Sequence, residues 1–177
     1  MKTKICSFLA VILIVNLSCN TINKKGEGSD GEVSLEDRLV VRMNLVVLEN
    51  DTFEVYYRKE DEVFGPDQKI SKKIQGSEDS QDIDFAFDLL EFPSHLRIDF
   101  GRNVNQGVIT LNDFSFHFND NRHDFTAEEL KKYFVPNAGL EVNFDSGVMN
   151  TKSVNDKYNP YLNSNNISYF VNKLILF

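Results

Sequence analysis

The sequence predicts an all-β protein, built as a single β-sandwich with one or two short helices. The main evidence is residues 82–118, where apolar and polar residues alternate in three runs. A period of two is typical of antiparallel strands with one buried and one solvated face. Turn-forming residues separate the runs. The positions predicted to face inward are Ile83, Phe85, Phe87 and Leu89 in the first run, Leu96, Ile98 and Phe100 in the second, and Phe114, Phe116 and Phe118 in the third.

Length and composition fit one globular domain with one core. The chain has 177 residues, of which 41% are hydrophobic and 26% charged, with fifteen Phe and no Trp. Phe suits the dry interior of a sandwich, whereas Trp suits a platform on which sugars stack. The formal net charge of -8 disfavours contact with nucleic acid or anionic lipid surfaces, so we expect no nucleic-acid partner.

The N-terminus has the pattern of an export signal. A basic start is followed by an apolar stretch at residues 5–15 that is short for a bilayer span. The sequence LSC ending at Cys19 resembles the lipobox of bacterial lipoproteins, although Asn16 departs from its usual aliphatic residue. The resemblance implies that residues 1–18 are removed, that Cys19 is lipidated, and that the protein is anchored to a membrane of the bacterial cell envelope, at the outer membrane or cell surface. The alternatives are a secretory signal cleaved elsewhere and an uncleaved anchor.

Residues 19–34 are rich in Gly, Ser, Asn and charge, which predicts a flexible tether. The β-sandwich domain is expected over residues 35–177. Its first two predicted strands, near 39–48 and 53–58, are joined by a short polar link and are expected to form a hairpin. Further expectations are a loop at 59–68, a weak strand at 69–74, a polar loop at 75–81 and a bulge at Asn112-Asp113, where the apolar parity changes.

The last third of the chain contains the predicted helices. Thr126 and Glu129 have the spacing of a capping box, which starts a short helix that ends before Pro136. One more strand is predicted at 140–144, and residues 145–165 are expected to be turns. The apolar spacing after Ile167 favours a closing amphipathic helix, with a strand as the alternative.

Part of this pattern resembles a known class of domain. LRIDFG, followed by a short loop and GVITLNDFSFHF, is similar to paired strands in galactose-binding-like jelly-roll domains of bacterial (Bacteroidetes-type) surface lipoproteins. EELKKYFVPNAG and NPYL are similar to later parts of such chains. The resemblance is clear over residues 82–118 and implies a jelly-roll sandwich. It transfers no binding residue.

Five residues on predicted outward faces are the candidate ligand contacts. They are Tyr56, Arg58, Arg97, Asp99 and His117. Planar polar groups beside an aromatic ring are what a saccharide site needs. The simpler interpretation of Arg97 and Asp99 is an ion pair of structural value. Tyr161, which follows a proline, is interpreted as a packing anchor.

The chain carries no recognised catalytic motif, so we expect a protein that is not an enzyme. There is no Gly-x-Ser-x-Gly elbow and no glycine-rich phosphate loop. The cluster around His117 and His123 lacks the spacing of a zinc or EF-hand site, so no cofactor is expected, although structural calcium stays open. The sequence therefore favours a lipid-anchored, non-catalytic protein that binds glycan or another envelope component. The alternatives are an assembly subunit with a protein partner and a small glycan hydrolase.

Overall fold

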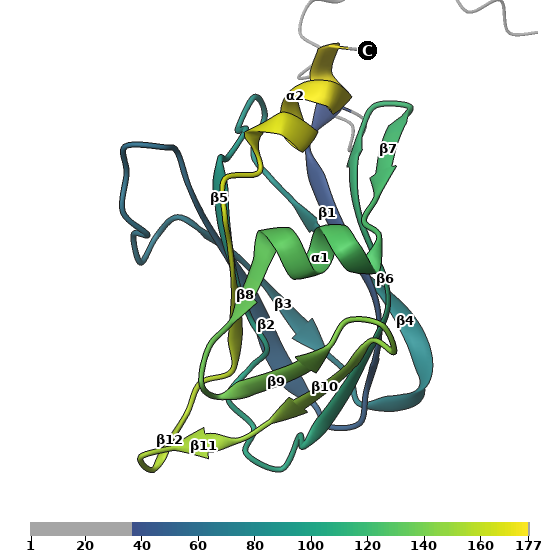
Figure 1. Ribbon diagram of the computed structural model, residues 1–177, viewed down its shortest axis with the longest axis vertical. Coiled ribbons are helices and arrows are strands. Elements are labelled where there is room, and N and C mark those ends of the chain that lie inside the picture. Colours follow the sequence, from purple (N-terminus) through teal and green to yellow (C-terminus); the bar gives the residue numbers. More distant parts are fainter. Residues whose placement is uncertain (1–36, 177) are drawn as a thin grey trace, which may run out of the picture. The chain divides into compact units, whose positions relative to one another are not determined.

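The computed structural model describes residues 37–176, which form an all-β sandwich with two short helices (Figure 1). The predicted signal, Cys19 and the tether lie outside the described residues. No helix of the described part is long and apolar enough to cross a membrane.

Two antiparallel sheets form the layers. The first has the order β4 (Ser77–Ala86), β1 (Val40–Val47), β6 (Val108–Phe118), β10 (Val148–Thr151) and β9 (Leu140–Asn143), with β7 (Asn121–Asp124) also paired to β6. The second has the order β3 (Lys69–Ile74), β2 (Asp51–Arg58), β5 (His95–Asp99), β13 (Tyr161–Ser164) and β8 (Phe134–Pro136). A separate small hairpin joins β11 (Ser153–Val154) to β12 (Lys157–Tyr158).

The predicted hairpin between the first two strands is wrong. β1 pairs with β4 and β6, whereas β2 pairs with β3 and β5 in the opposite sheet. Each strand buries apolar residues on one side, and crossing between the sheets lets these sides face each other, where a hairpin would leave them side by side. The loop predicted at 75–81 is also wrong, because β4 already begins at Ser77. The bulge is confirmed: Asn44 pairs with Asp113 and Leu45 with Leu111, which leaves Asn112 as the extra residue.

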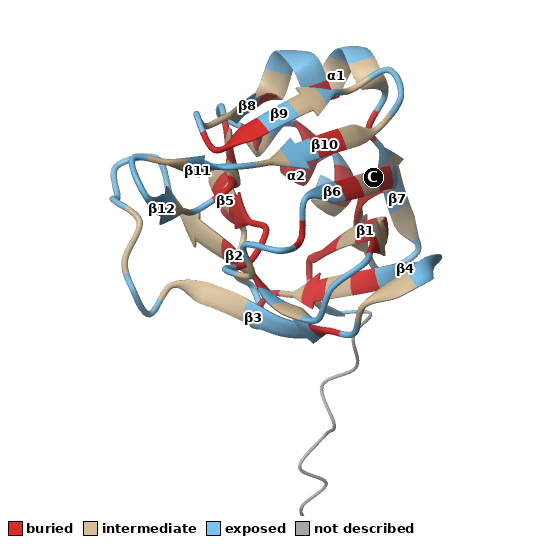
Figure 2. Ribbon diagram, turned by 90° about the horizontal axis from the view of Figure 1, so that it is seen from below, coloured by how far each residue is buried: buried red, intermediate tan, exposed pale blue. Residues whose placement is uncertain are grey.

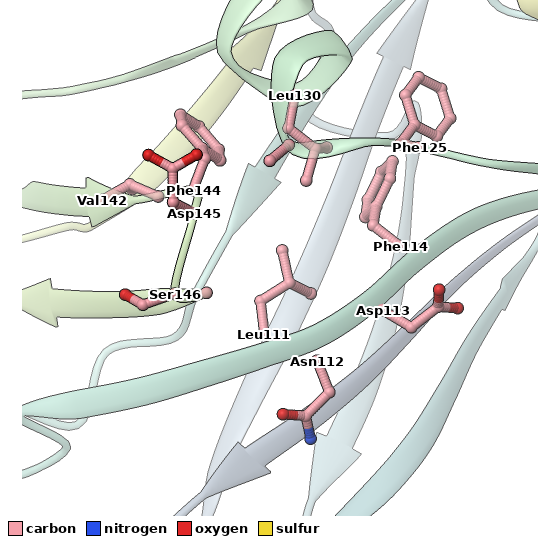
Figure 3. Close-up of a pocket in the computed structure, with 12 residues that line it drawn as sticks. Leu111, Asn112, Asp113, Phe114, Phe125, Leu130, Val142, Phe144, Asp145 and Ser146 are labelled. Carbon is pink, nitrogen blue, oxygen red and sulfur yellow. The ribbon is translucent and has the colours of Figure 1, made fainter.

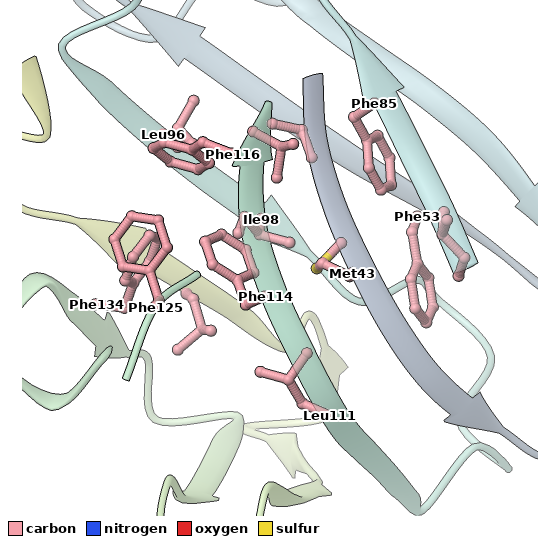
Figure 4. Packing of buried hydrophobic residues seen from close by; sticks show 14 of the residues in the cluster. Met43, Phe53, Phe85, Leu96, Ile98, Leu111, Phe114, Phe116, Phe125 and Phe134 are labelled. Carbon is pink, nitrogen blue, oxygen red and sulfur yellow. The ribbon is translucent and has the colours of Figure 1, made fainter. Parts of the chain in front are cut away.

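The core lies between the two sheets, where the buried strand positions face each other (Figure 2). Almost all of the predicted inward residues of 82–118 are in it, and Phe114 and Phe116 pack edge-on against Phe125 (Figure 4). Phe118 is partly buried and packs against the core, and Leu89 lies outside it. Its strand ends at Ala86, and its side chain is 48% exposed in the following turn.

Both helices cover openings between the sheets (Figure 1). Helix α1 (Ala127–Tyr133) starts at Thr126 with the predicted capping box. The tail is the helix α2 (Ser168–Leu176), which buries Phe170, Val171 and Leu174. The turn-rich prediction for 145–165 is wrong in part, because this segment contains β10 to β13.

Candidate functional site

The outer face of the second sheet carries a continuous polar and aromatic surface. On each strand the alternate residues, such as Val55, Ile98 and Leu162, are buried in the core, so their neighbours face outward. The strand registers place these neighbours in two rows. One row is Ser71, Glu54, Asp99 and Tyr161, and the other is Lys69, Tyr56, Arg97, Asn163 and Val135. We call these nine residues the sheet face.

Arg97 is at the centre of the sheet face and is fixed from three sides. Its Nε and Nη2 donate to the two carboxylate oxygens of Asp99 at 2.6 and 2.8 Å. Its guanidinium carbon lies 4.0 Å from the ring centroid of Tyr161 and 5.4 Å from that of Tyr56. The guanidinium is therefore held between two aromatic rings in one orientation.

Glu54 makes the second polar cluster of the sheet face. Its carboxylate accepts hydrogen bonds from Lys69 Nζ at 2.6 Å, Tyr56 Oη at 3.0 Å and Ser71 Oγ at 3.1 Å. Burial disfavours ionisation of Glu54, but these donors outweigh it and lower its pKa. The cluster also anchors the Tyr56 ring beside Arg97.

Asp99 is the most deeply placed carboxylate of the sheet face, with a side chain 11% exposed. Burial raises its pKa, and the bidentate hydrogen bonds from Arg97 offset this only in part. The predicted ion pair between Arg97 and Asp99 is confirmed, and it is largely shielded from solvent. There, loss of one partner costs more than at an exposed pair.

A tight turn after β5 brings Arg102 to the edge of the sheet face. The Asp51 carboxylate accepts from the backbone N–H groups of Arg102 and Asn103 at 3.0–3.1 Å. Gly101 has a φ of 84°, and a Cβ there would lie 2.0 Å from Asp51 Oδ2, so this turn requires glycine. Arg102 Nη2 lies 3.9 Å from Glu54 Oε2, and the Arg102 side chain is 83% exposed.

Several polar groups of the sheet face have no protein partner. Among residues 37–176, Arg97 Nη1, the Tyr161 hydroxyl and the Asn163 side-chain amide make no hydrogen bond. Asn163 Oδ1 is also buried, and a buried acceptor without a partner is unfavourable. These groups are adjacent, because Asn163 pairs with Arg97 and Tyr161 pairs with Asp99. Of these groups, Arg97 Nη1 and the Tyr161 hydroxyl can form hydrogen bonds with a molecule laid on the sheet, whereas Asn163 Oδ1 is buried.

Three of the five candidate residues meet on this face, and two do not. Tyr56, Arg97 and Asp99 lie side by side. Arg58 is one row further along β2, but its Nη1 donates to the carbonyls of Lys59 and Glu60, so it turns toward the following loop. His117 is on β6 of the other sheet, where its Nε2 lies 2.9 Å from Ser115 Oγ.

The sequence-based candidates include three of the nine residues of the sheet face and miss the other six. Tyr161, interpreted as a packing anchor, is only partly buried and stacks on Arg97. Asn163 and Lys69 were not among the candidates. Residues 161–164 alternate in burial within β13, but their sequence YLNS does not alternate apolar with polar residues, so it gave no signal of a strand.

A pocket of about 260 Å³ lies elsewhere, between β6, the start of α1 and the β9–β10 turn (Figure 3). Its inner wall is apolar and includes Leu111, Phe114 and Leu130. Its two carboxylates already have partners, since Asp113 accepts from Arg122 and Asp145 from Lys131. The sheet face has more free polar groups and accessible rings, so we take it as the candidate site.

The described residues bring together no group of three or more His, Cys, Asp or Glu side chains that could hold a metal ion. In the comparisons with known proteins, no family model matches the chain, and neither a curated protein nor a solved structure matches it.

Proposed function

We propose that this protein is a non-catalytic, lipid-anchored component of the bacterial cell envelope that binds glycan on its sheet face, within a jelly-roll domain of the galactose-binding-like kind. The observation that carries the binding proposal is the fixed guanidinium of Arg97 between Tyr56 and Tyr161, next to hydrogen-bonding groups that have no protein partner. Saccharides present hydroxyls and apolar C–H faces together, which suits a surface of planar polar groups and rings. The Cys19 motif supports the anchor.

The binding proposal is tested by titrating the purified full-length protein with a panel of envelope and host polysaccharides by calorimetry. We expect at least one glycan to bind the wild type and to bind Tyr161→Ala at least about tenfold more weakly. Tyr169→Ala is the matched control, because Tyr169 is also exposed but lies on α2. Absence of binding across the panel would reject the proposal, and so would equal losses in the two variants.

A second candidate function is that of an assembly subunit with a protein partner. Helix α2 exposes Tyr169 and Leu176, which are 67% and 73% exposed and line one shallow apolar pocket. An exposed apolar patch of this kind is common at protein interfaces. A photo-crosslinking amino acid placed at position 172, between these residues, tests this function in cells. Capture of an envelope protein from position 172, and not from position 163 on the sheet face, would favour it.

A further inference from the structure

We infer that the glycan recognised by the sheet face is anionic, carrying carboxylate or sulfate groups. The inference rests on the proposed function, because it names the ligand class of the same site. The inference is drawn from how exposed the charged side chains are, because a ligand that approaches from solvent first meets the most exposed charges.

On the sheet face and at its edge, the negative groups lie beneath the positive ones. The side chains of Asp99 and Glu54 are 11% and 13% exposed, whereas those of Arg97, Lys69 and Arg102 are 28%, 31% and 83% exposed. Each carboxylate is also engaged by neighbouring donors. A molecule approaching from solvent therefore meets ammonium and guanidinium groups first.

The cations keep donors free for a ligand. In the described part of the chain, Arg97 directs two nitrogens at Asp99 and leaves Nη1 without a partner. Within the same described residues, the Arg102 guanidinium makes only the long contact of 3.9 Å with Glu54. A guanidinium binds carboxylate and sulfate oxygens through charge-assisted hydrogen bonds, and its fixed orientation reduces the entropy lost on binding.

The overall acidity of the protein does not oppose this recognition at short range. The net charge of -8 belongs to the whole chain. At physiological salt, charges more than about 8 Å from a bound group are largely screened, so the nearest groups dominate. The nine residues of the sheet face carry no net charge, but its cations and Arg102 at its edge are more exposed than the carboxylates, so the outermost charges are positive.

The rings distinguish a saccharide from nucleic acid. Tyr161 already has a guanidinium 4.0 Å from its ring centroid, so that side of the ring is not free for a stacked base. A sugar acid can contact the part of the rings that the guanidinium leaves free, with the cation beside them binding its acid group.

The test uses chemically matched polysaccharides: polygalacturonate against its methyl ester, and dextran sulfate against dextran. Calorimetry with the full-length protein at about 0.15 M salt should give at least about tenfold tighter binding of an anionic member than of its neutral counterpart. Higher salt should reduce the difference. Arg97→Gln and Arg102→Gln should each lose most of the preference. Arg102 is highly exposed, so the second variant keeps the test valid if the first fails to fold.

Arg42→Gln is the matched control, because Arg42 makes the same bidentate pair, with Asp84, on the outer face of the other sheet. It should bind like the wild type. Equal binding of charged and neutral members overturns the inference and leaves the proposed function in place, whereas no binding of any glycan removes both. Oligothymidylate is the nucleic-acid control, and binding as tight as that of the anionic glycan would overturn the inference. So would a loss of the charge preference in Arg42→Gln equal to that in the Arg97 and Arg102 variants.

Discussion

Gly101 is the residue whose replacement should most disturb the sheet face. Gly101→Ala puts a left-handed backbone under strain and pushes the new Cβ into the Asp51 carboxylate, which must then release the amides of Arg102 and Asn103. We expect a loss of about 3 kcal/mol in the free energy of unfolding, from backbone strain of about 1–2 kcal/mol and the lost hydrogen bonds. Urea denaturation measures it.

Gly107→Ala is the control for this experiment. Gly107 also has a positive φ, of 63°, but a Cβ there meets nothing closer than 4.0 Å. It should lose only the strain term of about 1–2 kcal/mol. Equal losses at the two positions would show that Asp51 does not need Gly101.

The Arg42–Asp84 pair should make stability depend on acid pH. Hydrogen bonds from Arg42 lower the pKa of Asp84 below its ordinary value of about 3.9. The ionised carboxylate therefore adds stability above about pH 4, and this is lost as the pH falls through the lower folded pKa. Asp84→Asn should cost about 1 kcal/mol or less at pH 7, because both side chains are about one-third exposed. Urea midpoints for both proteins should converge toward pH 2.5. A constant difference between pH 7 and 2.5 would contradict this.

Residue parity predicted most of the core and failed where a strand ended. Phe85 and Phe116 are buried as their alternation indicates, because each lies inside a paired strand. Leu89 continues the same parity, but β4 has ended by then and its side chain is exposed. Alternation describes a strand and does not say where pairing stops.

At the scale of elements, helix α2 should be sensitive to mild acid. His123 of β7 lies 4.7 Å, between ring centroids, from both Phe125 and Phe170, and its side chain is 14% exposed. Burial lowers its pKa, and Lys173 adds to this while Glu129 and Asp124 oppose it. The folded pKa is then below the ordinary value of about 6.5, so the neutral ring contributes stability above that pH, and the contribution is lost as the pH falls through the folded pKa.

The variant His123→Gln tests this dependence. Between pH 7 and pH 5 the wild type should lose more unfolding free energy than the variant, because the variant has no ring to protonate at this position. His95 and His117 are present in both proteins, so their contributions to the pH dependence of the unfolding free energy cancel in the comparison. The protection factors of the Phe170 and Leu174 amides, which correct for the intrinsic pH dependence of hydrogen exchange, should fall more in the wild type than in the variant over the same pH range. Parallel pH profiles for the two proteins would rule out a role for His123.

Elements with local signals could be predicted, and elements defined by distant pairing could not. The capping box at Thr126 and the apolar spacing of α2 are complete within a few residues. β8 and β13 are short and depend on pairing: β8 pairs with β13, and β13 also pairs with β5, which lies far earlier in the chain. No sequence pattern within residues 145–165 predicts the pairing of β13 with β5 and β8.

At the scale of the whole molecule, the candidate site depends on the order of strands in one sheet. Tyr56, Arg97 and Tyr161 come from three strands and meet only because β5 lies between β2 and β13. Sequence alternation could place Tyr56, Arg97 and Asp99 on outward faces. It could not separate them from His117, because outward faces of both sheets have the same pattern.

The membrane anchor and the folded domain should be separable. Among the described residues, the hydrophobic core is built from residues between Leu39 and Leu174, and we expect it to form without the lipid. Cys19→Ala should abolish labelling by a palmitate analogue and move the protein from the detergent phase to the aqueous phase, because each buried acyl CH₂ is worth about 0.8 kcal/mol of membrane affinity. Its urea midpoint should equal that of the wild type. Cys6→Ala is the matched control, since Cys6 lies inside the predicted signal and should leave labelling intact. Labelling that persists in Cys19→Ala would reject the assignment of the lipid to Cys19.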